Sequence, residues 1–393
     1  MKFVLFALAL AAFAIGTTEF APMGLLPVIA DGIHVSIPSA GLLISAYAIG
    51  VMVGAPLMTL LLSATRRRNA LLLLMAIFTL GNLLSAVAPN YFTLLLSRLV
   101  TSMAHGAFFG LGSMVAAALV AKEKRAAAVS TMFLGLTIAN IGGVPVATWI
   151  GNVVGWRISF AGTAGLGLLA FTALMFALPK GEPGTRPDVA AELRVLARPN
   201  VLRSLLTTVL GAGAMFTLYT YLAAILADIT HATANFVTAM LVLTGIGFTL
   251  GNAISGKLSD KWPRGTLLGF FLLLAVSMFA FPVLARSETG AGIALLIWGA
   301  AAFGLVPPLQ MRVMHDAHEA PGLASSVNIG AFNLGNALGA AAGSFVIDAG
   351  LGYAWVTPVG ALLAVMGLGL VWFTPSRTSS SSSALPAQAQ EAA

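Results

Sequence analysis

Long apolar stretches alternate with short polar segments along almost the whole chain. About 20 apolar residues are enough to cross the hydrocarbon core of a bilayer, and twelve stretches reach that length. They cover residues 3–30, 39–64, 69–88, 91–119, 126–150, 157–178, 201–227, 233–257, 264–285, 290–312, 322–347 and 354–374. Because lipid offers no hydrogen-bond partners, each segment must satisfy its own backbone N–H and C=O groups. The pattern therefore predicts an all-α membrane protein with twelve transmembrane helices.

The composition agrees with this prediction. Of the 393 residues, 59% are apolar and 8% are charged, whereas a soluble domain is about a quarter charged. This argues against a water-soluble protein with a single core. The chain has no cysteine, which excludes a disulfide framework or a thiolate metal site. Two GxxxG pairs, Gly50 with Gly54 and Gly247 with Gly251, predict close helix contacts, with or without a functional meaning.

The net charge of +7 is of the sign that nucleic-acid-binding proteins show, so the placement of the basic residues matters. With a cytoplasmic amino terminus, seventeen of the 20 Lys and Arg residues are cytoplasmic, and Arg98, Arg157 and Arg286 are the exceptions. This asymmetry follows the positive-inside rule. It predicts that both termini are cytoplasmic and that no nucleic acid is bound. The apolar run after Lys2 resembles a signal peptide, but it continues past Glu19 and is too long for one.

A polar stretch divides the spans into two sets of six. We predict an N-terminal six-helix bundle at 1–178, a cytoplasmic linker at 179–200, a C-terminal six-helix bundle at 201–374 and a disordered cytoplasmic tail at 375–393. Matches at near-constant offsets indicate an internal duplication, an organisation in which one bundle rocks against the other around a midplane site. At an offset of 197, Gly50, Gly54 and Arg67 match Gly247, Gly251 and Arg264, and at 199, Gly151 and Trp156 match Gly350 and Trp355.

Glu19 stands out among the 13 acidic residues because it lies inside the first apolar stretch, where a charge is costly and indicates function. At 1.5 Å per residue, Glu19 lies ~6 Å outward of the centre of its span, and Arg98 lies ~9 Å outward of the centre of the fourth span. The two opposite charges are expected at a similar depth. Burial disfavours an ionised carboxylate and a nearby cation favours it, so Glu19 is a candidate for proton uptake and release. A static ion pair with Arg98, or a cap-like bond at 16–18, is the structural alternative.

His105 lies two turns beyond Arg98 on the same helix face and is the third candidate for proton coupling. A neutral histidine bonded to a neighbouring helix is the alternative. Other side chains at membrane depth are candidates for the wall of a substrate cavity, although amides also tie helices together and aromatic rings also pack or face lipid. These candidates are Phe109, Asn140, Phe216, Tyr219, Tyr221, Trp298, Gln310 and Asn333.

Other chemistry finds little support. The sequence HDAHE at 315–319 superficially offers metal ligands, but it is not the HExxH pattern and lies in a short loop, so no metal site and no cofactor are expected. The chain has no Walker A motif, nucleotide-binding glycine loop or GxSxG, which argues against ATP-driven transport by this chain alone and against serine hydrolase chemistry. Pro307 and Pro308 must kink or break the tenth span, because each lacks an N–H donor.

Twelve spans in two halves with a cytoplasmic linker resemble the major facilitator superfamily over essentially residues 1–375. GKLSDKWPR at 256–264 is similar to the family's loop signature after the second span of a half; the first half has Thr59 and Ser63 before the basic run 66–68 and lacks the acid. Arg98 with Gly106 and Gly110 resembles the span-four signature. The glycines of 135–151 with Pro145 resemble the span-five antiporter signature. The resemblance implies gate motifs at Arg67, Gly143, Pro145, Gly256, Asp260 and Arg264.

More narrowly, GTTEFAPMGLLP at 16–27, HGAFFG at 105–110 and GWR at 155–157 resemble the bacterial drug:proton antiporter branch, and within it the inner-membrane efflux permeases for sugars or arabinose, chloramphenicol and purines. The resemblance implies a proton-coupled efflux transporter of the bacterial inner membrane that works by alternating access. Its expected partners are a small-molecule substrate, protons and the lipid bilayer, and the expected state is a monomer. The alternative is an uncoupled facilitator or importer, whose flux ignores a pH gradient. A membrane enzyme would need a reactive constellation facing a cavity, and none of the usual ones is visible.

Overall fold

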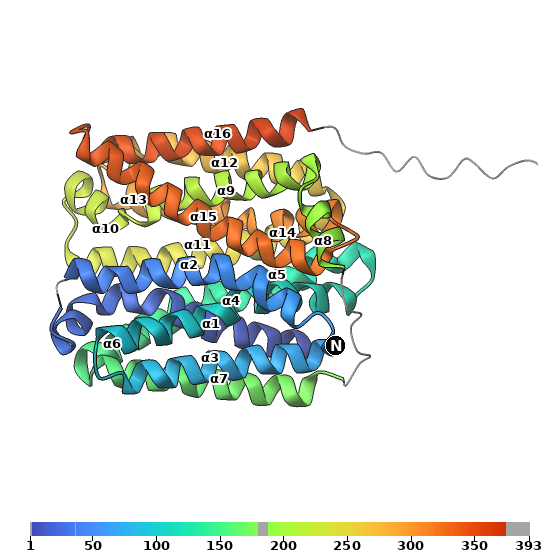
Figure 1. The fold of residues 1–393 in the computed structure, drawn as a ribbon. Helices are drawn as coiled ribbons and strands as arrows, with labels where there is room; N and C mark the ends of the chain where they lie inside the picture. Colours follow the sequence, from blue (N-terminus) through green and yellow to red (C-terminus); the bar gives the residue numbers. More distant parts are fainter. Residues whose placement is uncertain (1, 36, 180–187, 375–393) are drawn as a thin grey trace, which may run out of the picture.

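The computed structural model describes residues 2–35, 37–179 and 188–374, and every regular element among them is a helix (Figure 1). The first group of helices contains α1 (Lys2–Gly32), α2 (Ile37–Leu61), α3 (Arg67–Val87), α4 (Tyr91–Ala118), α5 (Arg125–Ile138) with η2 (Ala139–Gly143) and α6 (Val144–Val153), and α7 (Trp156–Ala177). The second contains α9 (Pro199–Tyr219) with α10 (Leu222–Ile225) and η3 (Leu226–Thr230), α11 (Ala234–Lys261), α12 (Pro263–Leu284), α13 (Glu288–Gly304) with α14 (Val306–Asp316), α15 (Pro321–Asp348), and α16 (Val356–Phe373). Short elements between them are η1 (Lys122–Lys124), α8 (Val189–Leu196) and η4 (Tyr353–Trp355).

These elements form twelve rods that match the twelve predicted spans. In the described part of the chain, eleven rods are long and apolar enough to cross a membrane. The twelfth is α15, a 28-residue helix rich in glycine, alanine and serine that lies among the others (Figure 1). The predicted twelve-helix architecture is therefore confirmed.

Two rods change their helical geometry next to proline residues. The fifth rod has a π-helical turn, η2, which ends at Gly143 just before Pro145. The tenth rod is interrupted at Leu305, and Pro307 and Pro308 lie in the first turn of α14. A proline ring clashes with the preceding turn inside a helix but is tolerated in the first turn, where its missing N–H is not needed. The predicted break in the tenth span is confirmed.

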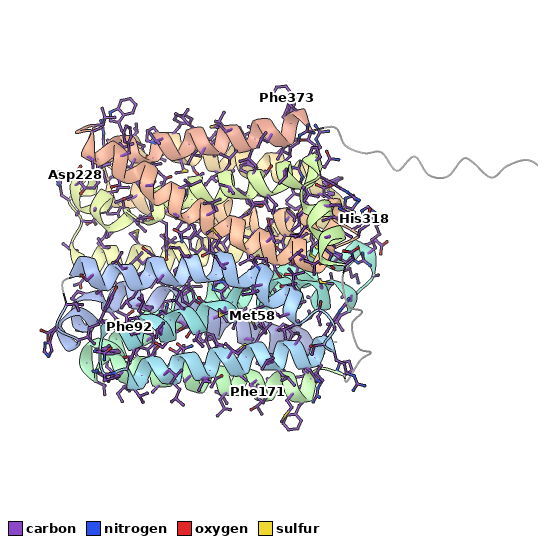
Figure 2. The ribbon with its side chains drawn as sticks, viewed as in Figure 1. Met58, Phe92, Phe171, Asp228, His318 and Phe373 are labelled. Carbon is purple, nitrogen blue, oxygen red and sulfur yellow. The ribbon has the colours of Figure 1, made fainter. Side chains whose placement is uncertain are left out.

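The two ends of the rods are named here by the chain termini. The start of α1 and the end of α16 lie at one end, which we call the terminus side, and the other end is the far side (Figure 1). Figure 2 shows His318 at the terminus side and Asp228 at the far side. Phe373, whose side chain is 84% exposed, points away from the bundle in the same view. Large apolar side chains on the outer surface are what a protein surrounded by lipid requires.

The two groups repeat the same close helix contacts. A Cβ atom on Gly54 would press against the backbone of Met103, so α2 and α4 approach closely, and one on Gly251 would overlap the backbone of Ala300 between α11 and α13. Gly251 lies 197 residues after Gly54, and Ala300 lies 197 residues after Met103, which is the offset read from the sequence. The GxxxG pairs therefore serve close helix packing, which is the use that small residues have in membrane bundles.

The basic loops of the two groups also correspond, with one difference from the prediction. Arg264 donates a hydrogen bond of 2.7 Å to the carbonyl of Trp372, at the end of α16. In the first group, Arg68 donates a 2.8 Å hydrogen bond to the carbonyl of Met175, at the end of α7. Judged by these contacts, the counterpart of Arg264 is Arg68, whereas the offset of 197 pointed to Arg67, which is exposed. Arg68 and Arg264 are 196 residues apart, so the loops of the two groups differ in length by one residue, and a constant offset of 197 does not detect this.

The linker and the tail are only partly described. Residues 180–187 of the predicted linker and 375–393, the predicted tail, lie outside the described residues. Within the linker, Asp188 caps α8 by accepting a hydrogen bond from the N–H of Ala191. Val195 of α8 is buried against Val201 and Val313 at the terminus side of the second group. The sequence analysis did not predict a helix in this polar stretch.

Candidate transport site

Glu19 lies near the middle of α1, on the wall of a cavity between the two groups of helices. Its side chain is 14% exposed. Its carboxylate faces His105 of α4, with 4.0 Å between Oε2 and the ring nitrogen Nε2. A carboxyl group and an imidazole are both able to bind protons, so two of the three predicted proton-coupling residues share one wall of this cavity.

Tyr47 of α2 holds the other side of the His105 ring. Its hydroxyl lies 3.1 Å from Nδ1 of His105, and both side chains are buried. When this hydroxyl donates to Nδ1, the imidazole proton sits on Nε2 and faces Glu19. With Nδ1 as the donor instead, the ring presents the lone pair of Nε2 to Glu19, so the contact with Tyr47 orients the ring in either tautomer.

Arg98 reaches α1 one residue away from Glu19. Its guanidinium donates a 3.1 Å hydrogen bond to the backbone carbonyl of Thr18 and a weaker one of 3.4 Å to the Thr18 hydroxyl. The Thr18 carbonyl is free because residue 22, whose N–H would bond it in a regular helix, is Pro22. Arg98 also lies 4.2 Å from the centre of the Tyr47 ring, a cation–π contact.

Arg98 and Glu19 therefore share a depth, as expected, without forming the direct ion pair offered as the structural alternative. In the described part of the chain, the basic side chain within 4.0 Å of the Glu19 carboxylate is that of His105. The bond of Arg98 to Thr18 instead satisfies a carbonyl at the proline-containing turn of α1. Arg98 is 1% exposed and is not among the residues that line the cavity, so its charge is held behind the cavity wall.

The cavity combines an apolar interior with six polar side chains. Phe109 and Phe133 line it from the first group, and Phe216, Phe303 and Phe332 line it from the second. Its polar lining residues are Glu19, His105, Thr208, Gln310, Asn328 and Asn333. Four of the eight predicted cavity residues, Phe109, Phe216, Gln310 and Asn333, are in this lining. A largely apolar wall with a few placed polar groups is typical of small-molecule sites.

Three further predicted cavity residues are in contact, because Asn140 and Trp298 both contact Tyr219. Tyr219 lies one turn toward the far side from Phe216. The Tyr219 ring packs edge-on against Phe20 of the first group at 6.3 Å between centroids. Its hydroxyl donates a 3.1 Å hydrogen bond to the side chain of Asn140. Behind it, the ring of Trp298 stacks at 6.3 Å and is fully buried. These contacts join the first group of helices to the second next to the cavity.

Tyr221, the eighth predicted cavity residue, is not brought to the cavity. Its hydroxyl donates a 2.8 Å hydrogen bond to the carbonyl of Ala340 on α15, and its ring fills the space that Gly343 leaves. These contacts tie α10 to α15 within the second group. Tyr221 is therefore packed between helices, which is the alternative that the sequence analysis gave for its aromatic candidates.

The predicted gate residues lie at two different places. Asp260, at the end of α11, accepts hydrogen bonds of 2.8 Å and 3.1 Å from the N–H groups of Ala126 and Ala127 in the first turn of α5. A Cβ on Gly256 would overlap Ser130 of α5. Asp260 and Gly256 therefore both belong to the contact between the two groups of helices. Gly143 instead packs against Thr17 of α1, within the first group. Pro145 follows it in α6.

Hydrogen bonds between the two groups seal the terminus side. Among the described residues, seven such hydrogen-bonded residue pairs lie between the terminus side and the middle of the bundle. They join Asp260 to Ala126 and Ala127, Ser130 to Asn252, Thr59 to Ser326, Ser325 to Gly110, Thr137 to Thr249, and Asn140 to Tyr219. The conformation is therefore closed at the terminus side.

Sequence reasoning missed Tyr47, Thr208 and Ser325. Tyr47 carries a weak signal, because it is a rare polar aromatic residue in an otherwise apolar second span. The two hydroxyl residues carry none, since serine and threonine are common in membrane helices. Their importance appears only through their partners.

The comparisons with known proteins agree with this architecture. The model of the family described as the Major Facilitator Superfamily matches residues 8–329. The chain belongs to that superfamily. It is a membrane transporter and a multi-pass inner membrane protein.

Several curated relatives cover nearly the whole chain. The protein is 68% identical over 356 residues to the inner membrane transport protein YdhP of Escherichia coli (strain K12), covering 91% of this chain and 92% of the relative. It is 33% identical over 357 residues to a chloramphenicol resistance protein of Streptomyces lividans, covering 90% of each. A probable sugar efflux transporter of Helicobacter pylori (strain ATCC 700392 / 26695) is 32% identical over 352 residues, with 88% and 89% covered.

Solved structures share the fold at low sequence identity. The human organic anion transporter MFSD10 superposes with a TM-score of 0.76 at 16% identity, covering 94% of this chain and 98% of that one. The superfamily transporter FucP, solved in an outward conformation, gives a TM-score of 0.77 at 16% identity, with 96% and 99% covered. These likenesses support the twelve-helix fold.

Proposed function

We propose that this protein is a proton-coupled antiporter that exports a small organic solute by alternating access. The observation that carries the proposal is the Glu19 carboxylate facing His105 on the wall of a mostly apolar cavity between the two groups of helices. A proton taken up at Glu19 removes a charge from this wall, and its release restores the charge. Because a charged and a neutral wall differ in their affinity for solute and in the solvation they require, proton and solute binding become linked.

The direction of transport rests on the side assignments. The positive-inside pattern of the sequence supports a cytoplasmic terminus side, so the sealed conformation is the one closed to the cytoplasm. In the proposed cycle, Glu19 receives its proton from outside in this conformation, the terminus side then opens, and solute entering from the cytoplasm favours proton release. The relatives named as a chloramphenicol resistance protein and a sugar efflux transporter support export.

Transport by purified protein in proteoliposomes tests the coupling. With an imposed pH gradient and a panel of sugars, purines and amphenicols, we expect the Glu19→Gln variant to lose gradient-driven flux while keeping the melting temperature of the parent. Glu123→Gln is the matched control, because Glu123 is an exposed acid in η1 outside the membrane rods. Gradient-driven flux by Glu19→Gln at the parent rate contradicts the proposal and favours an uncoupled facilitator or importer.

A further inference from the structure

Polar side chains from three helices form one continuous hydrogen-bonded row on the second-group wall of the cavity. The hydroxyl of Thr208 donates to Oδ1 of Asn328 at 2.6 Å, and Nδ2 of Asn328 donates to Oε1 of Gln310 at 2.6 Å. The Gln310 amide then donates to the side-chain oxygen and the carbonyl of Ser325. Thr208, Asn328 and Gln310 line the cavity, whereas Ser325 lies behind them.

The row ends on the other group of helices. The hydroxyl of Ser325 donates a 3.1 Å hydrogen bond to the backbone carbonyl of Gly110, on α4. The next residue, Ser326, fills the space that Gly110 leaves and hydrogen-bonds Thr59 of α2 at 2.6 Å. These are contacts of the terminus-side seal. The cavity wall and the seal are therefore connected by a chain of hydrogen bonds that ends on the backbone of α4.

All four bonds of the row point in the same direction, from donor to acceptor. Ser325 has a single hydroxyl proton, which it gives to Gly110, and it offers its oxygen to Gln310. Hydrogen bonds arranged in this way polarise and strengthen one another. A group that takes the amide of Gln310 or Asn328 away from its partner therefore weakens the last bond, which holds the seal.

Resting on the function proposed above, we propose that the Thr208–Asn328–Gln310–Ser325 row detects the transported solute and couples its binding to opening of the terminus-side seal. A solute that hydrogen-bonds Asn328 or Gln310 replaces a bond within the row, and Ser325 loses the partner that orients its hydroxyl toward Gly110. Gly110 lies on α4, five residues after His105, so release of this bond removes a restraint on the helix that carries Arg98 and His105.

The same wall defines the class of solute. Its described polar lining residues on the second group, Thr208, Gln310, Asn328 and Asn333, are neutral and offer both donors and acceptors, and phenylalanine rings surround them. The acid of the cavity, Glu19, lies on the opposite wall and faces His105. The chemistry fits a neutral solute that has hydroxyl or amide groups together with an apolar or aromatic part, in preference to a lipophilic cation without hydrogen-bonding groups.

A single reporter thiol tests the connection to the seal. The chain has no cysteine, and Thr59 is 5% exposed at the contact with Ser326. Thr59→Cys therefore reacts with a bulky maleimide only when the seal opens. In purified protein without a pH gradient, we expect Gln310→Met to raise the alkylation rate about fivefold, the change in a two-state equilibrium that follows the loss of one net hydrogen bond. Ser325→Ala, which leaves the cavity lining intact, is expected to act in the same way.

Ser277→Ala is the matched control, because Ser277 is a buried serine of α12 outside the cavity lining that donates to Leu274 of its own helix. We expect its alkylation rate to equal that of the parent. Rates in Gln310→Met and Ser325→Ala that equal the parent rate, with melting temperatures showing folded protein, overturn the connection. Equal increases in all three variants overturn it as well, since they indicate general loosening of the seal.

Three probes test the class of solute. Chloramphenicol and arabinose are neutral and carry hydroxyl groups, whereas tetraphenylphosphonium is a cation without hydrogen-bonding groups. We expect at least one neutral probe to raise the alkylation rate of Thr59→Cys, and this increase to disappear in Gln310→Met. An increase with tetraphenylphosphonium alone, or with none of the three, overturns the solute class. Because no gradient is applied, these results do not depend on whether Glu19→Gln retains coupling.

Discussion

Arg98 donates a 3.1 Å hydrogen bond to the backbone carbonyl of Thr18, the carbonyl that Pro22 leaves without its helical partner. The bond joins α4 to α1 beside Glu19 and keeps the guanidinium behind the cavity wall. A proline in the sequence thus creates the acceptor that positions an arginine on another helix.

Pro22→Ala tests this relationship. The alanine N–H is able to bond the Thr18 carbonyl within α1 and competes with Arg98 for it. We expect gradient-driven transport to fall severalfold while the melting temperature stays level or rises, because a helix-interior proline costs ~3 kcal/mol in a regular helix. Pro27→Ala is the control, since it restores a bond to a different carbonyl. Equal transport by both variants contradicts the positioning role of the Arg98–Thr18 bond.

Tyr47→Phe removes the hydroxyl that bonds Nδ1 of His105 and leaves the ring beneath Arg98 in place. We expect a changed pH profile of transport, because the hydrogen bond that orients the His105 ring toward Glu19 is lost. The lost bond costs ~1–3 kcal/mol of stability. Tyr221→Phe loses a 2.8 Å hydrogen bond far from His105, so it is expected to lower the melting temperature without altering the pH profile. Identical pH profiles for Tyr47→Phe and the parent rule out this role.

Asp260→Asn removes the charge that Asp260 places at the first turn of α5. An anion at a helix N-terminus stabilises it by about 0.3–1 kcal/mol, up to about 2 when partly buried. We expect the seal to open more often, seen as faster alkylation of Thr59→Cys. Asp348→Asn is the control, because Asp348 bonds Ser344 of its own helix on the far side. An unchanged alkylation rate in Asp260→Asn would count against a role of this contact in the seal.

Gly251→Ala forces α11 and α13 apart, because the new methyl group overlaps the backbone carbonyl of Ala300. Overpacking of this kind costs about 1–3 kcal/mol. A Cβ on Gly269 of α12 would meet open space, so Gly269→Ala is expected to gain up to about 1 kcal/mol from helix propensity. In thermal unfolding, we expect the melting temperature of Gly251→Ala to lie below that of the parent and the melting temperature of Gly269→Ala to equal or exceed it. A melting temperature of Gly251→Ala above that of Gly269→Ala would exclude close packing as the reason for glycine at position 251.

Glu319, at the terminus side, makes a pH-dependent contribution to the stability of the folded protein. Arg198 donates two hydrogen bonds of 2.8 Å to its carboxylate, and these lower the pKa of Glu319 below its ordinary value of 4.5. A depressed pKa means that the contribution is present above pH 4.5 and is lost as the pH falls through the lowered value. The melting temperature of Glu319→Gln should therefore lie slightly below that of the parent at neutral pH and approach it in acid. The exposure of the pair keeps the difference small.

The sequence predicted the rods well because hydropathy is a local property. The ends of all twelve spans lie within a few residues of the helices, and the break at Pro307 follows from the chemistry of one residue type. The sequence also singled out Glu19 through its cost in lipid. It did not reveal the acceptor of Arg98, because Thr18 and Glu19 are adjacent in the chain and only their side-chain and carbonyl directions tell them apart.

By itself, then, the amino-acid sequence determined the number of membrane crossings, the repeat of two halves and the presence of a costly acid, since each depends on residues close together in the chain or on a simple offset. The tertiary structure decided which side chains meet: Tyr47 with His105, Asn328 with Gln310, and Ser325 with Gly110. These pairs come from different helices, and their contact depends on how the helices rotate and pack. Hydrophobic periodicity does not encode that arrangement.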